Sequence, residues 1–270
     1  MDYSGNKIKK DTVNNKKPFR RVHVGFDLPI ELPDIDYFLK CYTKSIPSHN
    51  FQSNESIRKK YGTRLDKNFF RHFERIVLEN PEPRVLDLGC GTGGSKKYLN
   101  SLGISDVTSL DISSRHADIL ADAHCLPFRN LSFDVILSTA TIEHFYNPFI
   151  AFKEMNRVLR HGGRLLASAS FWERWHDNSC FHCTPHGLYI LCTHSGFEII
   201  DIWSGWGFFA SVFSHAISKR LKKLGLVLQF LFDSALRVVR GEDAVKKHRL
   251  RTSGSFGVCA MKQRPIEGVD

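Results

Sequence analysis

The sequence predicts an α/β protein built on a doubly wound, Rossmann-like sheet that is mostly parallel. Apolar strand-like segments alternate with helical segments between residues 84 and 203, and this order builds a parallel sheet covered on both faces. The last strand should be antiparallel, N-terminal helices should precede the sheet, and a helical insertion should precede the last strand. The 270 residues, 42% of them hydrophobic, suit one such domain with additions.

A glycine-rich turn after the first predicted strand is the most informative segment of the chain. Pro81 and Pro83 end a preceding helix, residues 84–88 form the strand, and glycines then occupy positions 89, 91, 93 and 94. Glycine adopts backbone angles that a Cβ forbids, and it lets a ligand lie against the main chain. Dinucleotide-binding folds use similar turns, so the turn alone does not decide the function.

A helix is predicted upstream of this strand, over residues 55–78. The apolar residues that share its face recur every four positions, and they are Ile57, Tyr61, Leu65, Phe69 and Phe73. This periodicity indicates a helix packed on the sheet, where it could also cover a ligand pocket.

Prolines and the lengths of the connecting segments predict where the later helices and strands begin and end. Pro148 and Pro185 suit first helical turns, and the gap between Asp111 and Asp118 leaves little room for a crossover helix. The predicted helices are 94–102, 148–159 and 184–195. The predicted strands after the first are 107–110, 118–120, 135–138, 164–170, 197–203 and 255–261.

The domain organisation is predicted to be simple. Residues 1–22 are polar and Lys-rich and should form a disordered basic segment, whereas 23–270 should form a single domain. An insertion at about 208–240 combines apolar helical periodicity with Lys219, Arg220, Lys222 and Lys223. It could be a packed hairpin, a dimer surface, a substrate lid or a contact with an anionic membrane surface.

Charge and cysteine content narrow the class of protein further. The formal net charge of +10 lies mainly in the two flanks, which suggests an anionic partner or surface rather than a property of the central domain. The seven cysteines are scattered and indicate no disulfide framework. With no apolar segment typical of a secretory signal or a transmembrane helix, we expect a cytoplasmic protein that could associate peripherally with a membrane.

Several motifs occur together in an order that identifies a family resemblance. They are DLGCGTG at 87–93, an acid after the second strand, LPF at 126–128, SFD at 132–134, EH at 143–144 and RVLRHGG at 157–163. In this order they resemble the class I S-adenosylmethionine-dependent methyltransferases, in particular the type 11 small-molecule branch. The resemblance covers about residues 83–204 and implies S-adenosyl-L-methionine as the cofactor.

The resemblance implies a set of cofactor-binding residues. Asp87, Gly89, Gly91 and Gly93 would form the loop beside the methionine part, Asp111 would bind the ribose, and Asp122 with the Ala123 backbone would bind the adenine edge. Independently, the carboxyl ends of parallel strands meet at one edge of a doubly wound sheet, which is where ligands bind. Since Gly89, Asp111, Asp122 and Ser138 all fall at or just after such ends, we expect them in one shared site.

Two histidines are the candidate catalytic residues. His144 follows the fourth strand, and His176 lies in the aromatic loop after the fifth, where the resembled family places its acceptor. An imidazole titrates near neutral pH and can remove a proton from an acceptor hydroxyl. Zinc binding by the cluster Cys180, His182, Cys183 and His186 is the alternative, but the second Cys-x-x-Cys of a four-sulfur site is absent, and we expect no metal.

The sequence favours in-line methyl transfer to an oxygen of a small-molecule, sugar or lipid-linked acceptor. An RNA ribose or protein methyltransferase, motivated by the basic flanks, is the alternative. Residues 138–141 read Ser-Thr-Ala-Thr, which lacks the Pro-Pro-aromatic turn of base-amino methylases. A non-catalytic S-adenosylmethionine-binding module and an NAD dehydrogenase fit the motifs less well. The acceptor, the methylated atom and the oligomeric state are not given by the sequence.

Overall fold

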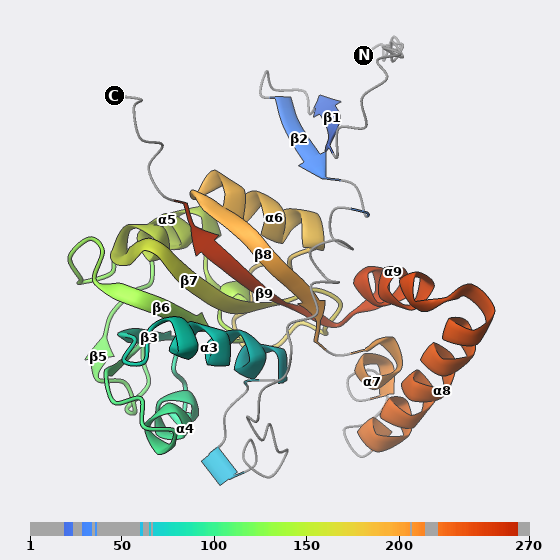
Figure 1. The fold of residues 1–270 in the computed structure, drawn as a ribbon, viewed down its shortest axis with the longest axis horizontal. Helices are drawn as coiled ribbons and strands as arrows, with labels where there is room; N and C mark the ends of the chain where they lie inside the picture. Colours follow the sequence, from blue (N-terminus) through green and yellow to red (C-terminus); the bar gives the residue numbers. More distant parts are fainter. Residues whose placement is uncertain are drawn as a thin grey trace.

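A seven-stranded mixed sheet forms the centre of the molecule (Figure 1). The computed structural model describes residues 19–23, 29–33, 36, 60–61, 65, 67–205, 207–213 and 221–263. The strand order is β5-β4-β3-β6-β7-β9-β8, with β9 antiparallel to both neighbours and the other pairs parallel, as predicted. The strands are β3 Val85–Leu88, β4 Val107–Asp111, β5 Ile119–Leu120, β6 Phe133–Ser138, β7 Leu159–Ser170, β8 Phe197–Ser204 and β9 Ser255–Lys262.

Helices cover both faces of this sheet, which confirms the doubly wound prediction. On one face, α3 (Lys67–Glu79) and α4 (Gly94–Ser101) pack through Phe73 and Tyr98 against strand residues such as Val85. On the other face, α5 (Pro148–Val158) and α6 (Pro185–His194) pack against the alternate strand residues, among them Leu86. Successive strand side chains point to opposite faces, so each strand contributes to both cores.

The end signals of α5 and α6 act as the sequence predicts. The Asn147 side chain accepts a hydrogen bond from the backbone N–H of Ile150, and the Thr184 hydroxyl accepts one from the backbone N–H of Gly187. Pro148 and Pro185 occupy the first turns, where a missing N–H leaves no helical bond unmade. No helix lies between β4 and β5, which confirms the short second crossover.

The structure agrees with part of what the sequence predicts for the N-terminal helix and the N-terminal basic segment. The described helix α3 begins at Lys67, and Leu65, Phe69 and Phe73 are buried on the predicted face, whereas Ile57 lies outside the described residues. Phe19–His23 (β1) pairs antiparallel with Pro29–Pro33 (β2). The segment predicted to be disordered therefore overlaps a strand over residues 19–22, and its remainder, 1–18, lies outside the described residues.

The helical segment before the last strand is longer than predicted. It comprises α7 (Phe208–Ser211), α8 (Lys222–Arg240) and α9 (Glu242–Thr252), so the boundary near 240 was wrong. Helix α9 was missed because it is mostly charged and buries few apolar residues, among them Val245 and Leu250, and apolar periodicity could not indicate it. None of the described helices combines the length and apolar character needed to cross a membrane.

Candidate functional site

A cavity of about 590 Å³ opens at the carboxyl ends of β3 and β4 and beside the turn that follows β6. Its volume lies within the range of about 300–1,000 Å³ found for small-molecule sites. Of the ten residues predicted for the site, six line the cavity: Gly89, Gly91, Asp111, Asp122, Ala123 and His144. The structure therefore brings most of the predicted constellation together.

The glycine turn forms one wall of the cavity. Gly89, Gly91 and Gly93 have φ values of 74°, 53° and 71°, in the left-handed region that residues with a Cβ rarely adopt. At Gly89 an added Cβ would lie 2.3 Å from the Thr141 hydroxyl oxygen, so the turn after β6 packs directly against it. Gly93 precedes α4 without lining the cavity, and the following residues Gly94 and Ser95 present the helix N-terminus to it.

Asp111 lies at the end of β4 and organises this wall. One carboxylate oxygen accepts a hydrogen bond of 3.0 Å from the Gly91 backbone N–H, and the other accepts bonds of 3.0 Å from the backbone N–H groups of Ser113 and Ser114. The side chain lines the cavity and therefore links its polar surface to the conformation of the glycine turn.

Replacing Asp111 with alanine should weaken binding of S-adenosylhomocysteine by about 1.5–3 kcal/mol, the range for a hydrogen bond to a charged group. The change removes both the predicted ribose acceptor and the acceptor of three backbone N–H groups. Calorimetry measures the affinity, and thermal unfolding checks that the variant is folded. A folded variant with unchanged affinity would remove Asp111 from the site.

A second acid, Asp122, is held by a histidine that sequence reasoning missed. Asp122 accepts hydrogen bonds from the backbone N–H and the ring Nδ1 of His124, while the ring Nε2 accepts one of 3.2 Å from the Asn147 backbone N–H. Burial alone would raise the pKa of Asp122, but the bonds from His124 outweigh it and leave the pKa below its usual value. The His124 ring stacks on Tyr146, and both line the cavity.

Asp87 and Ser138, also predicted for the site, lie beneath it instead. Neither lines the cavity, both are buried, and Asp87 Oδ2 and Ser138 Oγ each lack a hydrogen-bond partner among the described residues. Burial raises the pKa of Asp87 to about 7, helped by the nearby charge of Asp111 and opposed by a hydrogen bond from the Lys96 backbone N–H. Asp87 is thus an acid that titrates near neutral pH directly under the glycine turn.

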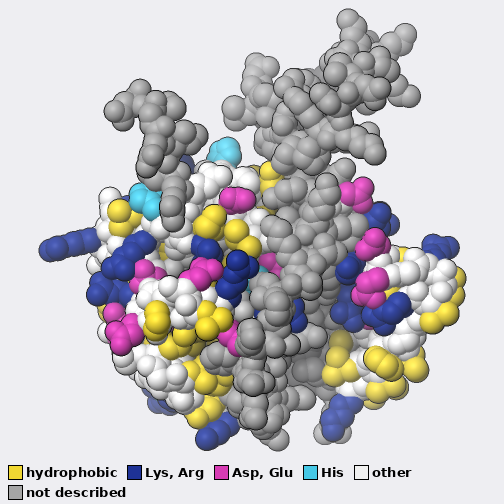
Figure 2. Space-filling view, viewed as in Figure 1, with side chains coloured by type: hydrophobic (Ala, Val, Ile, Leu, Met, Phe, Trp, Pro, Cys, Tyr) yellow, Lys and Arg dark blue, Asp and Glu magenta, His cyan; other side chains and the backbone are white. Residues whose placement is uncertain are grey.

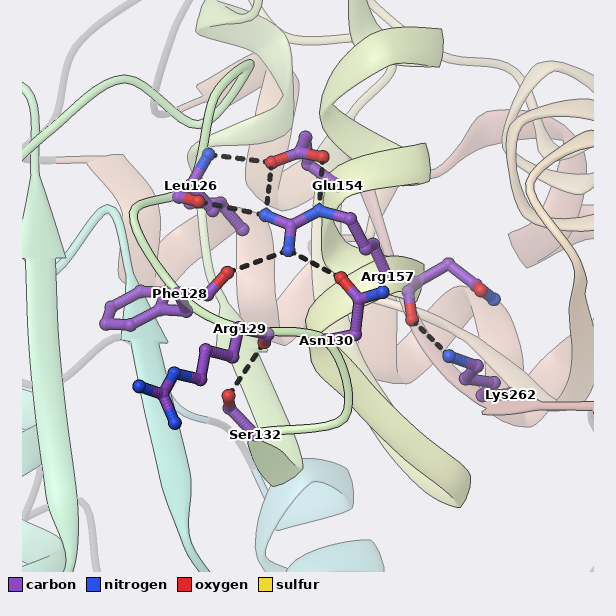
Figure 3. A network of polar contacts seen from close by, with 9 residues as sticks. Leu126, Phe128, Arg129, Asn130, Ser132, Glu154, Arg157 and Lys262 are labelled. Atoms are coloured by element: carbon purple, nitrogen blue, oxygen red, sulfur yellow. Dashed lines mark hydrogen bonds and ion pairs between the residues drawn. The ribbon is translucent and has the colours of Figure 1, made fainter.

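The LPF loop is fastened to α5 by one arginine (Figure 3). The Arg157 guanidinium donates to the backbone carbonyls of Leu126 and Phe128 at 2.9 and 2.7 Å and to both oxygens of Glu154 at 2.7 Å. Glu154 in turn accepts a bond of 2.8 Å from the Leu126 backbone N–H. This network fixes the loop that follows Asp122 and Ala123, and it explains why the LPF and RVLR motifs occur together.

The two candidate catalytic histidines meet at the other end of the cavity. His144 ends the 3-10 turn Ile142–His144 and lines the cavity, and its ring centre lies 5.6 Å from that of His176. His176 itself does not line the cavity, but the next residue, Asp177, does, with a left-handed φ of 44°. Glu143, which the sequence marked as part of the EH motif without a role of its own, lies buried beside both rings.

The cysteine-containing alternative does not assemble as a metal site among the described residues. Cys180 is exposed, whereas Cys183 is buried, and burial together with the charge of Glu143 raises the pKa of the Cys183 thiol to about 11. A thiol of this pKa is a poor source of the thiolate that a metal requires. The nearby groups that do come together are Glu143, His144 and His176.

Comparisons with known proteins agree with this geometry. A family model described as a methyltransferase domain matches residues 86–167. A protein of Encephalitozoon cuniculi named "Putative methyltransferase" is 31% identical over 162 residues, which cover 47% of this chain and 77% of that protein. A malonyl-[acyl-carrier protein] O-methyltransferase of Herminiimonas arsenicoxydans is 29% identical over 51% of this chain and 53% of its own length, so the match spans about half of that relative.

Among solved structures, a "putative sarcosine dimethylglycine methyltransferase" from Galdieria sulphuraria aligns with 17% identity and a TM-score of 0.49, over 79% of this chain and 92% of that chain. The fold, the site and the sequence relatives together define a class. The chain belongs to the class I S-adenosylmethionine-dependent methyltransferases of the type 11 kind, and its cofactor is S-adenosylmethionine.

The residues of the cavity fit this cofactor. The left-handed glycine turn leaves open main chain, and the α4 N-terminus favours an anionic group such as a carboxylate. Asp111 and Asp122 offer acceptors for hydroxyl and amino groups, and the exposed apolar side chain of Ile112 also lines the cavity. Ile112 was missed because an apolar residue after an acid carries no distinctive sequence signal.

Proposed function

We propose that this methyltransferase methylates an oxygen of a lipid-linked acceptor, and that it does so while docked on an anionic membrane surface. The observation that carries the proposal is the orientation of α8. Its side chains are arranged in reverse of an ordinary surface helix, with polar groups inward and apolar groups outward.

The inward side of α8 is held by polar contacts. Gln229 and Asp233 are buried, and the Gln229 amide donates to Asp233 at 2.9 Å. The Gln229 carbonyl oxygen accepts a bond of 3.1 Å from the Phe209 backbone N–H of α7, and Asp233 accepts two bonds from Arg249 of α9 at 2.6 and 2.9 Å. These contacts fix which side of α8 faces the protein.

The outward side of α8 is apolar. Figure 2 shows hydrophobic side chains gathered over this helix, and Phe230, Leu231 and Val238 are 69%, 56% and 87% exposed. Leu224 and Val227 extend the same face, which we call the outer face of α8. Soluble proteins rarely expose contiguous apolar patches of this kind without a partner for them.

Charge favours a lipid surface as that partner. Lys223 and Arg240 are exposed near the two ends of α8, and the chain carries a formal net charge of +10. A helix that presents apolar side chains between basic ones is typical of helices that lie in the membrane–water interface. At 19 residues, α8 would lie along the surface for about 28 Å.

Helix α8 is connected to the acceptor end of the cavity through Phe232, which lies beside its outer face. The ring centre of Phe232 in α8 lies 5.6 Å from that of Phe209. The adjacent Phe208 stacks on Trp172, with ring centres 5.1 Å apart. Trp172 begins the loop that carries His176. A surface bound by α8 would therefore lie near the loop where an acceptor enters, which supports a lipid-linked acceptor over a freely diffusing one.

The chemistry needs few groups from the protein. S-adenosylmethionine supplies an activated methyl group, and methyl transfer is an in-line displacement that requires neither a covalent intermediate nor a redox step. The glycine turn, Asp111 and Asp122 would hold the cofactor, and the Trp172–Asp177 loop would orient the acceptor and exclude water. An imidazole of His144 or His176 would accept the proton of the acceptor hydroxyl as its oxygen takes the methyl group.

Binding to liposomes should test this proposal. Co-sedimentation should rise with the fraction of anionic lipid and fall with salt, because each basic residue near such a surface contributes about 1 kcal/mol that salt screens. The double variant Phe230→Ser/Leu231→Ser should lose at least about tenfold in binding, since burying each side chain is worth about 1.5–3 kcal/mol. Leu78→Ser, at an exposed position of α3, is the matched control and should bind normally.

The acceptor class is tested in parallel with a labelled methyl group. Incubation of the protein with labelled S-adenosylmethionine and cell-extract fractions should place label in the lipid fraction. Equal binding to neutral and anionic liposomes, or none to either, would overturn membrane docking. Because nucleic-acid binding is also salt-dependent, an RNA-binding assay runs beside it, and label in RNA or protein would favour those acceptors instead.

A further inference from the structure

Three potential ligand groups converge beside the acceptor end of the cavity. Glu143 and His144 come from the 3-10 turn after β6, and His176 comes from the loop after β7. One carboxylate oxygen and two ring nitrogens from these residues lie within 4.8 Å of one another. Two imidazoles and one carboxylate form a ligand set that divalent transition metals bind.

Glu143 is buried with one of its oxygens unsatisfied. Its side chain is 1% exposed, and Oε1 accepts a hydrogen bond of 2.9 Å from the Ser170 hydroxyl. Within the described part of the chain, Oε2 has no hydrogen-bond partner. Burying a carboxylate oxygen without a partner costs folding free energy, unless a cation or a further hydrogen-bond donor contacts it.

The hydrogen bond of His176 defines which ring nitrogen is free. Nδ1 lies 3.0 Å from the Arg174 carbonyl oxygen, which can only accept, so Nδ1 carries the hydrogen. In the neutral ring, Nε2 then directs a lone pair toward Glu143 Oε1, 3.9 Å away. Two acceptors face each other at a distance too long for a hydrogen bond, and a cation between them would satisfy both.

His144 completes the group. No hydrogen bond to its ring is formed by the part of the chain that the structure describes, and its ring lies nearly perpendicular to that of His176, at 84°. His144 also lines the cavity, so one ligand of the group borders the space where an acceptor would lie. Catalytic metal sites have this form, with three protein ligands and an open position.

We propose that Glu143, His144 and His176 bind one divalent transition metal whose open position faces the acceptor. This inference rests on the proposed oxygen acceptor, because a divalent ion there would hold and polarise an acceptor oxygen. It differs from the sequence expectation of no metal, and from the Cys180–His186 alternative. Metal bonds of about 2.0–2.2 Å in a tetrahedral site place ligand atoms about 3.3–3.6 Å apart, so the widest pair in this group must close by up to about 1.5 Å.

Metal titration of the full-length protein tests the site. After treatment with a chelator and dialysis, Zn²⁺, Mn²⁺ and Co²⁺ are titrated separately and followed by calorimetry and thermal unfolding. At least one of these ions should bind with one equivalent per chain and raise the unfolding temperature. Bound Co²⁺ should give an absorption spectrum without a sulfur-to-cobalt charge-transfer band, because no cysteine is a ligand.

Variants locate the ion. Glu143→Gln, which keeps the size of the side chain, and His176→Ala should each weaken metal binding at least tenfold, while affinity for S-adenosylhomocysteine stays unchanged and reports folding. His186→Ala and Cys180→Ser, from the alternative cluster, are the matched controls and should bind metal normally. If the two controls lose the metal instead, the site belongs to the alternative cluster.

Two further results would overturn the proposal. One is the absence of stoichiometric binding of any of the three ions to the chelator-treated protein. The other is binding that survives the double variant Glu143→Gln/His176→Ala. Because these readouts use no acceptor, a metal site that binds normally in a protein that labels no lipid would leave this inference intact and reject the proposed acceptor alone.

Discussion

Replacing His176 or His144 with alanine should lower turnover by about 10²–10⁴-fold, with the affinity for S-adenosylhomocysteine unchanged. Both rings lie at the end of the cavity where the acceptor hydroxyl must lose its proton. The expected loss is the same whether an imidazole takes the proton directly or acts as a metal ligand. Turnover is measured as transfer of labelled methyl to the acceptor fraction that the wild-type protein labels.

His161→Ala is the matched control for this experiment. His161 is exposed, its ring Nδ1 donates to the Gln263 backbone carbonyl oxygen at 3.3 Å, and it does not line the cavity. Its replacement should leave turnover unchanged. If both His144→Ala and His176→Ala retain full turnover with the true acceptor, proton removal must be assigned to another group or to water.

The protein without cofactor should lose stability as the pH rises from about 4 to about 7, and Asp87 should be a main cause. Burial raises the pKa of Asp87 from 3.8 to about 7, so the native state binds a proton there that the unfolded chain releases. This contribution is therefore complete below about pH 4 and lost as the pH rises through 7. At about 1.4 kcal/mol for each pH unit, its upper bound is about 4 kcal/mol.

The variant Asp87→Asn should remove this dependence. It should unfold at nearly the same denaturant concentration between pH 5 and 8, and above pH 7 it should be more stable than the wild-type protein. Urea unfolding at several pH values measures the free energy of unfolding. Asp243→Asn, at an exposed position of α9, is the control and should keep the wild-type slope. Parallel curves for the wild-type protein and Asp87→Asn would show that Asp87 is ionised in the native state.

The sequence predicts the fold well where local signals and global topology agree. The glycine turn, Pro148, and Thr184 with Pro185 each mark an element boundary by their own backbone chemistry, and the structure confirms these boundaries. Helix α9 shows the opposite case, because charged residues with two buried apolar positions carry no periodic signal. The length of the helical segment before β9 therefore could not be predicted.

The candidate site was predictable where a residue directly follows a strand. Gly89, Asp111 and Asp122 could be placed by topology alone. His124 could not, because its position depends on a contact between turns that are distant in the sequence, the hydrogen bond from the Asn147 backbone N–H to the His124 ring. Glu143 was placed near the site by the EH motif, but its contact with Ser170 could not be predicted. Asp87 was placed in the site by its motif, but β3 buries its side chain beneath the turn.

The position of β9 has a consequence for how the chain acquires its structure during synthesis. In the described sheet, β8 pairs with β9 alone, and β9 also forms the far neighbour of β7. Residues 197–204 therefore emerge from the ribosome long before the strand that joins them to the sheet. Until residues 255–262 follow, β7 and β8 each have an edge with unpaired backbone groups, which other chains can bind. Completion of this sheet is a late event, and the nascent chain should depend on chaperones until then.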